Sequence, residues 1–238
     1  MRTRRFPNPV FVALDTPDLA RAVELGTALG PHVGGLKVGL EFISAQGPDG
    51  IRKIVSLGLP VFADVKFHDI PNTVAGACRA LAHVGATLMN IHASGGEEMM
   101  RAGAEAARKV DPKTLVLGVT VLTSLDDSVL ASVGQKGPAA EQVVRLATLA
   151  KTSGLDGVVC AVHEIAPIRK ACGPDFVIVT PGIRPAGAAS NDQRRFMTPA
   201  EAFRAGADIL VVGRPITDAA DPVAAARAIA LELAETTA

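Results

Sequence analysis

The sequence predicts a single (β/α)8 barrel, also called a TIM barrel, in the α/β class. Eight short apolar runs rich in β-branched residues recur along the chain, and stretches rich in Ala and Leu lie between them. The runs are almost continuously apolar, which is typical of parallel strands covered on both faces. The 238 residues contain no Ser/Gly-rich linker, and barrels of this class often occupy about 250 residues as one unit. We therefore expect one barrel domain over residues 1–238.

The eight apolar runs follow one another as the strands of a barrel would. Their short length and β-branched composition favour strands over buried helices. Each interval between consecutive runs can hold one helix and two loops, which is the βα repeat of this fold. The predicted strands are Val10–Asp15, Gly35–Gly39, Val61–Lys66, Thr87–Ala93, Leu115–Leu122, Gly157–Cys160, Phe176–Gly182 and Asp208–Gly213.

Helical periodicity appears in most of the intervals between these runs. Two connections are long, 123–138 and 181–198, and the second is rich in Gly, Ala and Pro. A long loop of small residues inside a compact domain is typical of a lid or a ligand clamp. In this fold the loops after the seventh and eighth strands often bind phosphate. The predicted helices are Asp18–Leu29, Asn72–His83, Glu97–Val110, Ala139–Ser153, Glu164–Ala171, Pro199–Ala205 and Pro222–Ala234.

The composition argues against several classes of protein. Lys and Arg total 24, as do Asp and Glu, so the chain lacks the basic excess of a nucleic-acid or membrane-surface binder. Trp and Tyr are absent, which disfavours a base-stacking surface. The longest apolar stretch, Leu115–Leu122, is far shorter than the roughly 20 residues of a membrane helix. Three widely spaced cysteines without a CxxC motif predict reduced thiols. We expect a cytoplasmic protein with no nucleic-acid or membrane partner.

Charged residues end three consecutive predicted strands. Asp15 ends the first, Lys37 lies near the end of the second, and Asp64 and Lys66 end the third. Catalytic residues of barrel enzymes lie at these carboxyl ends, and charges there are costly unless they are paired or used. Asp64 and Lys66 are two residues apart, so they project to the same side. Each charge has a structural explanation by itself, but the row of alternating sign predicts an active site, with Asp69 following in the loop.

The segment Phe62–Val74, FADVKFHDIPNTV, resembles the signature of the orotidine 5′-phosphate decarboxylase family. The similarity extends along nearly the whole chain through ALD, LKVG, NIHASGG, VTVLTS, TPGIRP and VVGRPIT, in the family's order. The resemblance implies a lyase that converts orotidine 5′-monophosphate to UMP and CO2, the last step of de novo pyrimidine biosynthesis. It implies catalysis without a metal or organic cofactor, and a homodimer with active sites at the shared interface.

The resemblance also implies roles for the charges at the strand ends. Loss of CO2 from C6 of the pyrimidine leaves a carbanion without an adjacent electron sink, so catalysis needs electrostatic stabilisation and a ready proton donor. Lys66 would be that donor, flanked by Asp64 and by Asp69 of the partner subunit, and these carboxylates favour its ammonium form. Lys37 would bridge Asp64 and the ribose, and Asp15 would accept a hydrogen bond from a ribose hydroxyl.

The later strands are expected to hold the rest of the substrate. Gly213 allows the backbone to approach an anion closely, and Arg214 offers a planar fork to phosphate oxygens. Remote phosphate binding can drive loop closure and orient the ring that reacts. The resemblance adds Arg184 and Gln193 at the phosphate, Thr123 near the base and Thr73 on the dimer side of the pocket.

Three other functions fit parts of the pattern. Related barrels use a similar strand for Mg²⁺-dependent decarboxylation of sugar-acid phosphates or for aldol chemistry, and Asp64 with Glu41 could supply oxygen ligands. A Schiff base on Lys66 needs a neutral amine, which the flanking carboxylates oppose. A non-catalytic nucleotide-binding barrel would keep the phosphate residues and lose Lys66 or an Asp, and all are present. We expect structural roles for three histidines that lack metal-site spacing, His68, His92 and His163.

Overall fold

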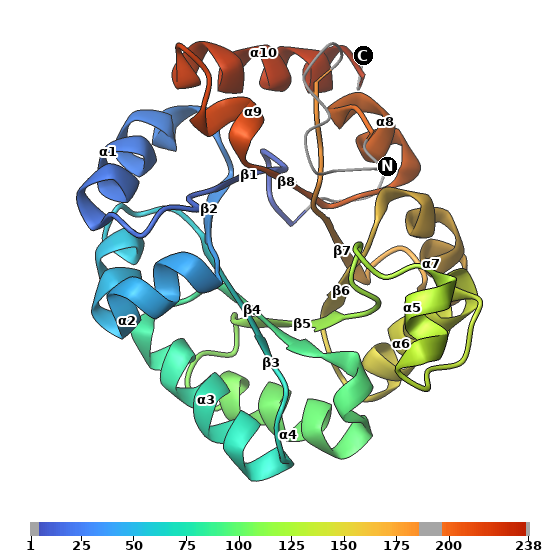
Figure 1. Cartoon of the computed structure of the whole chain (residues 1–238). Coiled ribbons are helices and arrows are strands. Elements are labelled where there is room, and N and C mark those ends of the chain that lie inside the picture. The colour runs from blue at the N-terminus through green and yellow to red at the C-terminus, as the bar shows by residue number, and fades with distance from the viewer. Residues whose placement is uncertain (1–4, 186–196, 237–238) are drawn as a thin grey trace.

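The computed structural model describes residues 5–185 and 197–236. In these residues eight parallel strands close into a barrel, in which each strand pairs with the next along the chain. The barrel closes where β8 (Ile209–Val212) pairs with β1 (Val10–Ala13). Helices form an outer ring around the strands (Figure 1). The predicted (β/α)8 TIM barrel is confirmed.

All eight predicted strands are present. With one exception they end one to three residues earlier than predicted, because residues at their carboxyl ends leave the hydrogen-bonded ladder and turn into loops at the mouth of the barrel. The exception is β3 (Val61–Phe67), which extends one residue further. The other strands are β2 (Gly35–Val38), β4 (Leu88–His92), β5 (Leu115–Val119), β6 (Gly157–Val159) and β7 (Val177–Thr180).

The helices agree with the prediction to within two residues at each end, and three were not predicted. Within α2 (Leu40–Val55), Gly47 has a φ of 61° and precedes Pro48, so local helix-breaking signals hid the helix. The other two, α5 (Asp127–Ser132) and α9 (Arg214–Thr217), are short. The predicted helices are α1 (Leu19–Leu29), α3 (Pro71–Val84), α4 (Glu97–Arg108), α6 (Ala139–Thr152), α7 (Ile165–Cys172), α8 (Pro199–Ala205) and α10 (Pro222–Glu235).

Buried apolar side chains fill the inside of the barrel, and a second, larger cluster packs between strands and helices. The inner cluster takes alternate residues of its strands, as the period-two geometry of a strand requires. Gly157 allows close packing of β6 and β7, because a Cβ atom there would lie 2.1 Å from the carbonyl oxygen of Val177. The inner cluster comprises Phe11, Ala13, Phe62, Leu88, Leu115, Leu117, Val177, Val179, Ile209 and Val211.

Within the described residues, no helix is long and apolar enough to cross a membrane. The cysteines, Cys78, Cys160 and Cys172, are free and buried. Burial raises the pKa of Cys78 to about 12, so this thiol stays protonated and unreactive at neutral pH.

Candidate active site

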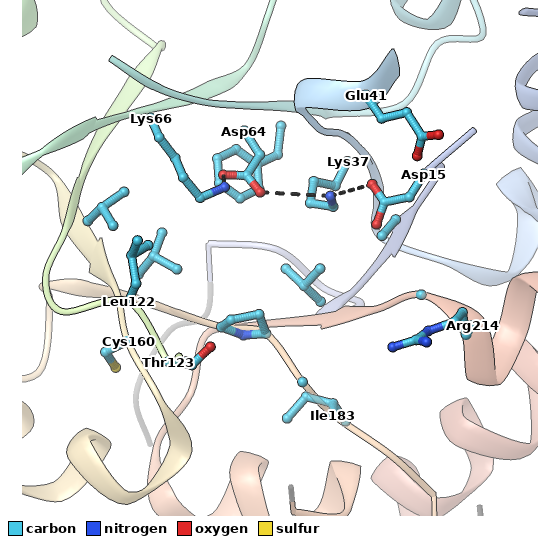
Figure 2. Close-up of a pocket in the computed structure, with 18 of the residues that line it drawn as sticks. Asp15, Lys37, Glu41, Asp64, Lys66, Leu122, Thr123, Cys160, Ile183 and Arg214 are labelled. Atoms are coloured by element: carbon cyan, nitrogen blue, oxygen red, sulfur yellow. Dashed lines mark hydrogen bonds and ion pairs between the residues drawn. The ribbon is translucent and has the colours of Figure 1, made fainter. Parts of the chain in front are cut away.

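A cavity of about 630 Å³ opens at the carboxyl end of the barrel. Residues at or just after the ends of several different strands line it (Figure 2). This is where the active sites of barrel enzymes lie, and a cavity with converging polar groups is the usual form of a small-molecule site. The charged lining residues are Asp15, Lys37, Glu41, Asp64, Lys66, Arg184, Arg214 and Asp218.

The four predicted strand-end charges form a continuous row along one wall of this cavity (Figure 2). The amine of Lys37 lies 2.7 Å from Oδ1 of Asp15 and 3.8 Å from Oδ2 of Asp64. The amine of Lys66 lies 2.6 Å from Oδ1 of Asp64. The side chains of residues 15, 37, 64 and 66 therefore converge as the sequence predicts, with alternating sign.

Asp64 is the centre of this row, since both lysines approach it. Its side chain is 16% exposed and that of Lys37 is 8% exposed. Burial by itself raises the pKa of Asp64, but the charges of Lys37 and Lys66, with hydrogen bonds from Lys66 and Asn90, outweigh burial and lower that pKa overall. The carboxylate is therefore ionised at neutral pH and holds the two ammonium groups on either side of it.

An irregularity of β3 brings Asp64 and Lys66 into the mouth. Ala63 pairs with Met89 and Phe67 with Ile91, so three residues of β3 lie opposite a single residue of β4. Lys66 has a φ of 51°, and among the described residues it is the only non-glycine residue with positive φ. Extra residues in one strand bend it and redirect its side chains, often beside active sites, and left-handed backbone at such sites must be held by its surroundings.

The single residue opposite the irregular segment is Asn90, for which we predicted no role from the sequence. It is fully buried. Its amide nitrogen donates to Oδ1 of Asp64 and its amide oxygen accepts from the backbone N–H of Lys66, both at 2.7 Å. The available signal was a polar residue inside an otherwise apolar strand, since such a residue needs buried partners.

Two histidines lie next to the charged row. The rings of His68 and His92 stack with centroids 5.4 Å apart. Burial lowers the pKa of His92, and the charges of His68 and Lys66 lower it further, against the opposing effect of Asp64. A neutral His92 adds no positive charge to the row. The structural role that we expect for these histidines stays a prediction.

The side of the cavity across from Lys66 carries groups suited to an anion. Arg214 begins α9 and faces the charged row across the cavity (Figure 2). Arg184 and Gly213 also line the cavity, and Arg184 is buried. Thr123 follows β5 and lines the same space near Cys160 (Figure 2). The cavity therefore joins an alternating charge row to two guanidinium groups.

Three predicted site residues are not among those that line this cavity. Asp69 and Thr73 are exposed, on the loop after β3 and in the first turn of α3. One oxygen of Asp69 accepts a 2.6 Å hydrogen bond from the N–H of Ile70. Gln193 lies outside the described residues.

The Mg²⁺ alternative required oxygen ligands that converge. Glu41 lies in the first turn of α2 and lines the cavity near Asp15 (Figure 2). Across residues 5–185 and 197–236, no group of three or more His, Cys, Asp or Glu side chains is arranged to hold a metal ion. Within the described residues, Asp64 and Glu41 therefore do not form a metal-binding group with a third His, Cys, Asp or Glu side chain.

A closed barrel with paired charges at its first three strands and arginines across the cavity defines a (β/α)8-barrel enzyme with a site suited to an anionic substrate. The model of the orotidine 5′-phosphate decarboxylase / HUMPS family matches residues 8–229. The chain belongs to this family.

Individual relatives agree with the family match. The orotidine 5′-phosphate decarboxylase of Moorella thermoacetica is 56% identical over 230 residues, which cover 94% of this chain and 91% of that protein. The protein of the same name from Anaeromyxobacter dehalogenans is 55% identical over 224 residues, which cover 94% of this chain and 97% of that one. The crystal structure of orotidine 5′-phosphate decarboxylase from Lactobacillus acidophilus matches with a TM-score of 0.84 and 40% identity, and covers 95% of this chain and 99% of that one.

Proposed function

We propose that this protein decarboxylates orotidine 5′-monophosphate to UMP and CO2, as the last step of de novo pyrimidine biosynthesis. The observation that carries the proposal is the row Lys37–Asp64–Lys66 at the mouth of the barrel, across the cavity from Arg214 (Figure 2). The names of the relatives at 55% and 56% identity support it. The charge pattern suits a reaction in which negative charge develops on carbon.

In the proposed reaction the bond between C6 and the carboxylate breaks, CO2 leaves, and the electron pair stays on C6. Lys66 then transfers a proton from its ammonium group to C6, which gives UMP and a neutral amine that regains a proton from water. The amine of Lys66 lies 2.6 Å from Oδ1 of Asp64, so a charge-assisted hydrogen bond holds the proton donor in place at the mouth of the barrel. A preorganised cation beside the developing carbanion lowers the barrier, because it costs no reorganisation during the reaction.

Asp64 has a second effect in this proposal. Its negative charge lies near the position of the substrate carboxylate, and the repulsion is relieved when CO2 departs. An interaction that is less unfavourable in the transition state than in the ground state increases the rate. Asp69 of the partner subunit would add a second carboxylate beside Lys66.

The remaining site residues would hold the nucleotide. Arg214, Arg184 and the backbone at Gly213 suit a phosphate, because guanidinium groups match phosphate oxygens in a bidentate geometry. Lys37 and Asp15 suit the ribose hydroxyls, since they lie together at 2.7 Å on the wall next to Lys66. Thr123 would contact the base, Gln193 the phosphate, and Thr73 the dimer side of the pocket.

We also propose a homodimer with shared active sites. Asp69 and Thr73 are exposed and do not line the cavity of their own chain, and the neighbouring Ile70 is 68% exposed. Mixing Lys66→Ala with Asp69→Ala protein, each inactive alone, should restore about a quarter of the wild-type activity, because half of randomly mixed dimers are mixed and each has one intact site. Mixtures that stay inactive, while native mass spectrometry detects mixed dimers, would contradict shared sites.

Three further expectations belong to this proposal. The chain would act as one domain over residues 1–238, supported by the single closed barrel. A cytoplasmic location is supported by the three free cysteines, because disulfides are rare there. The balance of 24 basic and 24 acidic residues supports the absence of a nucleic-acid partner.

The decisive experiment is an assay of CO2 release from orotidine 5′-monophosphate in excess EDTA. We expect wild-type protein to be active and Lys66→Ala to lose activity by at least about 1000-fold, because it lacks the proton donor. Lys53→Ala, on the exposed side of α2, serves as the matched control. Comparable rates for wild type and Lys66→Ala would overturn the assignment, and activity that disappears in EDTA would favour the Mg²⁺-dependent alternative.

A further inference from the structure

A fully buried amide lies directly behind the charged row. Asn90 is 0% exposed and is not among the residues that line the cavity. Its two hydrogen bonds, each 2.7 Å long, go to Oδ1 of Asp64 and come from the backbone N–H of Lys66. One side chain of β4 therefore contacts both members of the acid–lysine pair of β3.

The hydrogen bond from the backbone N–H of Lys66 to the amide oxygen of Asn90 compensates for the irregularity of β3. Three residues of β3 lie opposite Asn90 alone, and Lys66 is one of them. A buried N–H without a partner is costly. The left-handed φ of 51° at Lys66 also needs surroundings that hold it. Asn90 thus stabilises the backbone conformation from which the lysine side chain projects.

The hydrogen bond from the amide nitrogen of Asn90 to Oδ1 of Asp64 fixes the orientation of the Asp64 carboxylate. Oδ1 of Asp64 accepts from the amine of Lys66 at 2.6 Å and from the amide of Asn90 at 2.7 Å. With Oδ1 held in this way, Oδ2 lies toward Lys37 at 3.8 Å. Without the amide, the carboxylate would keep one strong donor on Oδ1 and could rotate away from the row. The amide of Asn90 and the amine of Lys66 thus hold the same oxygen of Asp64 from two sides.

We propose that Asn90 is a positioning residue for the decarboxylation, which sets the geometry of Asp64 and Lys66 without touching the substrate. The inference rests on the proposed function and extends it to a residue behind the cavity. It differs from a purely structural role, because both partners of the amide belong to the charged row.

Two variants separate the contributions of the amide. Asn90→Leu removes both hydrogen bonds with a side chain of similar shape. Asn90→Asp keeps an acceptor for the N–H of Lys66 but replaces the donor to Asp64 with a second carboxyl group. Two carboxylates at that distance share one proton, so this variant restores the missing donor only while the shared proton is bound.

The chain offers a matched control in Asn8. Its amide also donates one hydrogen bond and accepts one, to the carbonyl of His32 at 2.9 Å and from the N–H of Val10 at 3.0 Å. It lies just before β1, at the end of the barrel opposite the cavity. Asn8→Leu therefore removes an equivalent pair of bonds far from the charged row.

We expect Asn90→Leu to lower kcat for orotidine 5′-monophosphate by about 100-fold, because small displacements of catalytic groups have effects of this size. KM should change by less than about threefold, since the proposed phosphate contact at Arg214 lies across the cavity from the charged row. The acidic limb of its kcat profile should move to higher pH, because Asp64 loses a donor to its ionised form. Asn90→Asp should keep more activity at low pH and lose it as the shared proton dissociates.

Asn8→Leu should lower Tm without changing kcat or the pH profile. If Asn90→Leu behaves like this control, with kcat within about twofold of wild type and an unmoved acidic limb, Asn90 is structural and the inference is wrong. Should Asn90→Leu fail to fold, Asn90→Asp decides, and a pH profile identical to that of wild type would overturn the inference. Wild-type protein that releases no CO2 would instead refute the proposed function itself, and this inference with it.

Discussion

The amine of Lys66 lies 2.6 Å from Oδ1 of Asp64, two residues earlier on the same strand. This contact joins two side chains of one irregular segment, in which Lys66 has left-handed backbone. Asp64 also lies 3.8 Å from the amine of Lys37 on the neighbouring strand. A single carboxylate therefore separates two ammonium groups at the mouth of the barrel.

Replacing this carboxylate should be costly for the fold. Asp64→Asn leaves Lys37 and Lys66 without the charge between them, and we expect the free energy of unfolding to fall by about 3 kcal/mol. Asp49→Asn, which removes an exposed partner 2.5 Å from Arg52, should cost less than about 1 kcal/mol. Urea denaturation of both variants measures the difference. Equal losses would show that the row contributes no more than a surface ion pair.

The stacked histidines predict a dependence of stability on pH. The pKa of His92 is lowered from 6.5 by burial and by the charges of His68 and Lys66, so the folded protein binds this proton less readily than the unfolded chain. The contribution of neutral His92 is complete above pH 6.5 and is lost as the pH falls through the lower folded pKa. We expect His92→Gln to flatten the rise of unfolding free energy with pH in this window. Parallel curves for wild type and variant would contradict this.

The arginine across the cavity predicts a selective effect on phosphorylated substrate. Arg214→Ala should raise KM for orotidine 5′-monophosphate by about 10- to 100-fold, because it removes a charge-assisted contact with the phosphate. Turnover of orotidine, which lacks the phosphate, should not change. Steady-state kinetics with both substrates tests this, and equal losses on the two would place Arg214 elsewhere in the mechanism.

The same pair of substrates tests how the phosphate is used. We expect wild-type protein to have a much higher turnover number for the 5′-phosphate than for orotidine, because binding energy from a remote group can orient the reacting ring. Steady-state rates at saturating concentrations of each substrate give the comparison directly. Equal turnover numbers would mean that the phosphate contributes to binding alone.

Gly157 lies where β6 and β7 pack closely, so we expect its replacement by a larger residue to destabilise the protein. A Cβ atom at Gly157 would lie 2.1 Å from the carbonyl oxygen of Val177, whereas one at Gly76 would meet no atom within 4 Å. Gly157→Ala should therefore lower the free energy of unfolding by about 3 kcal/mol through overpacking. Gly76→Ala, inside α3, should raise it by about 0.5 to 1 kcal/mol. Thermal denaturation of both tests this, and a stable Gly157→Ala protein would contradict the packing.

Much of the architecture was readable from local sequence. The strands are short, apolar and β-branched, and these properties depend on neighbouring residues only. The absence of α2 from the prediction also has a local cause, since Gly47 and Pro48 interrupt its helical pattern. The strand-end charges Asp15, Lys37 and Lys66 were predictable because polar residues at the ends of buried strands are costly unless they are used.

The sequence by itself determined the order of strands, the family resemblance and the charged residues at the mouth. Only the tertiary structure decided that Asn90 contacts both Asp64 and Lys66, because this depends on the register between β3 and β4. It likewise decided that Asp69 and Thr73 lie apart from the cavity of their own chain. Hydrophobic periodicity determines which face of a strand is buried, whereas contacts across strands follow from where an irregular segment shifts the pairing.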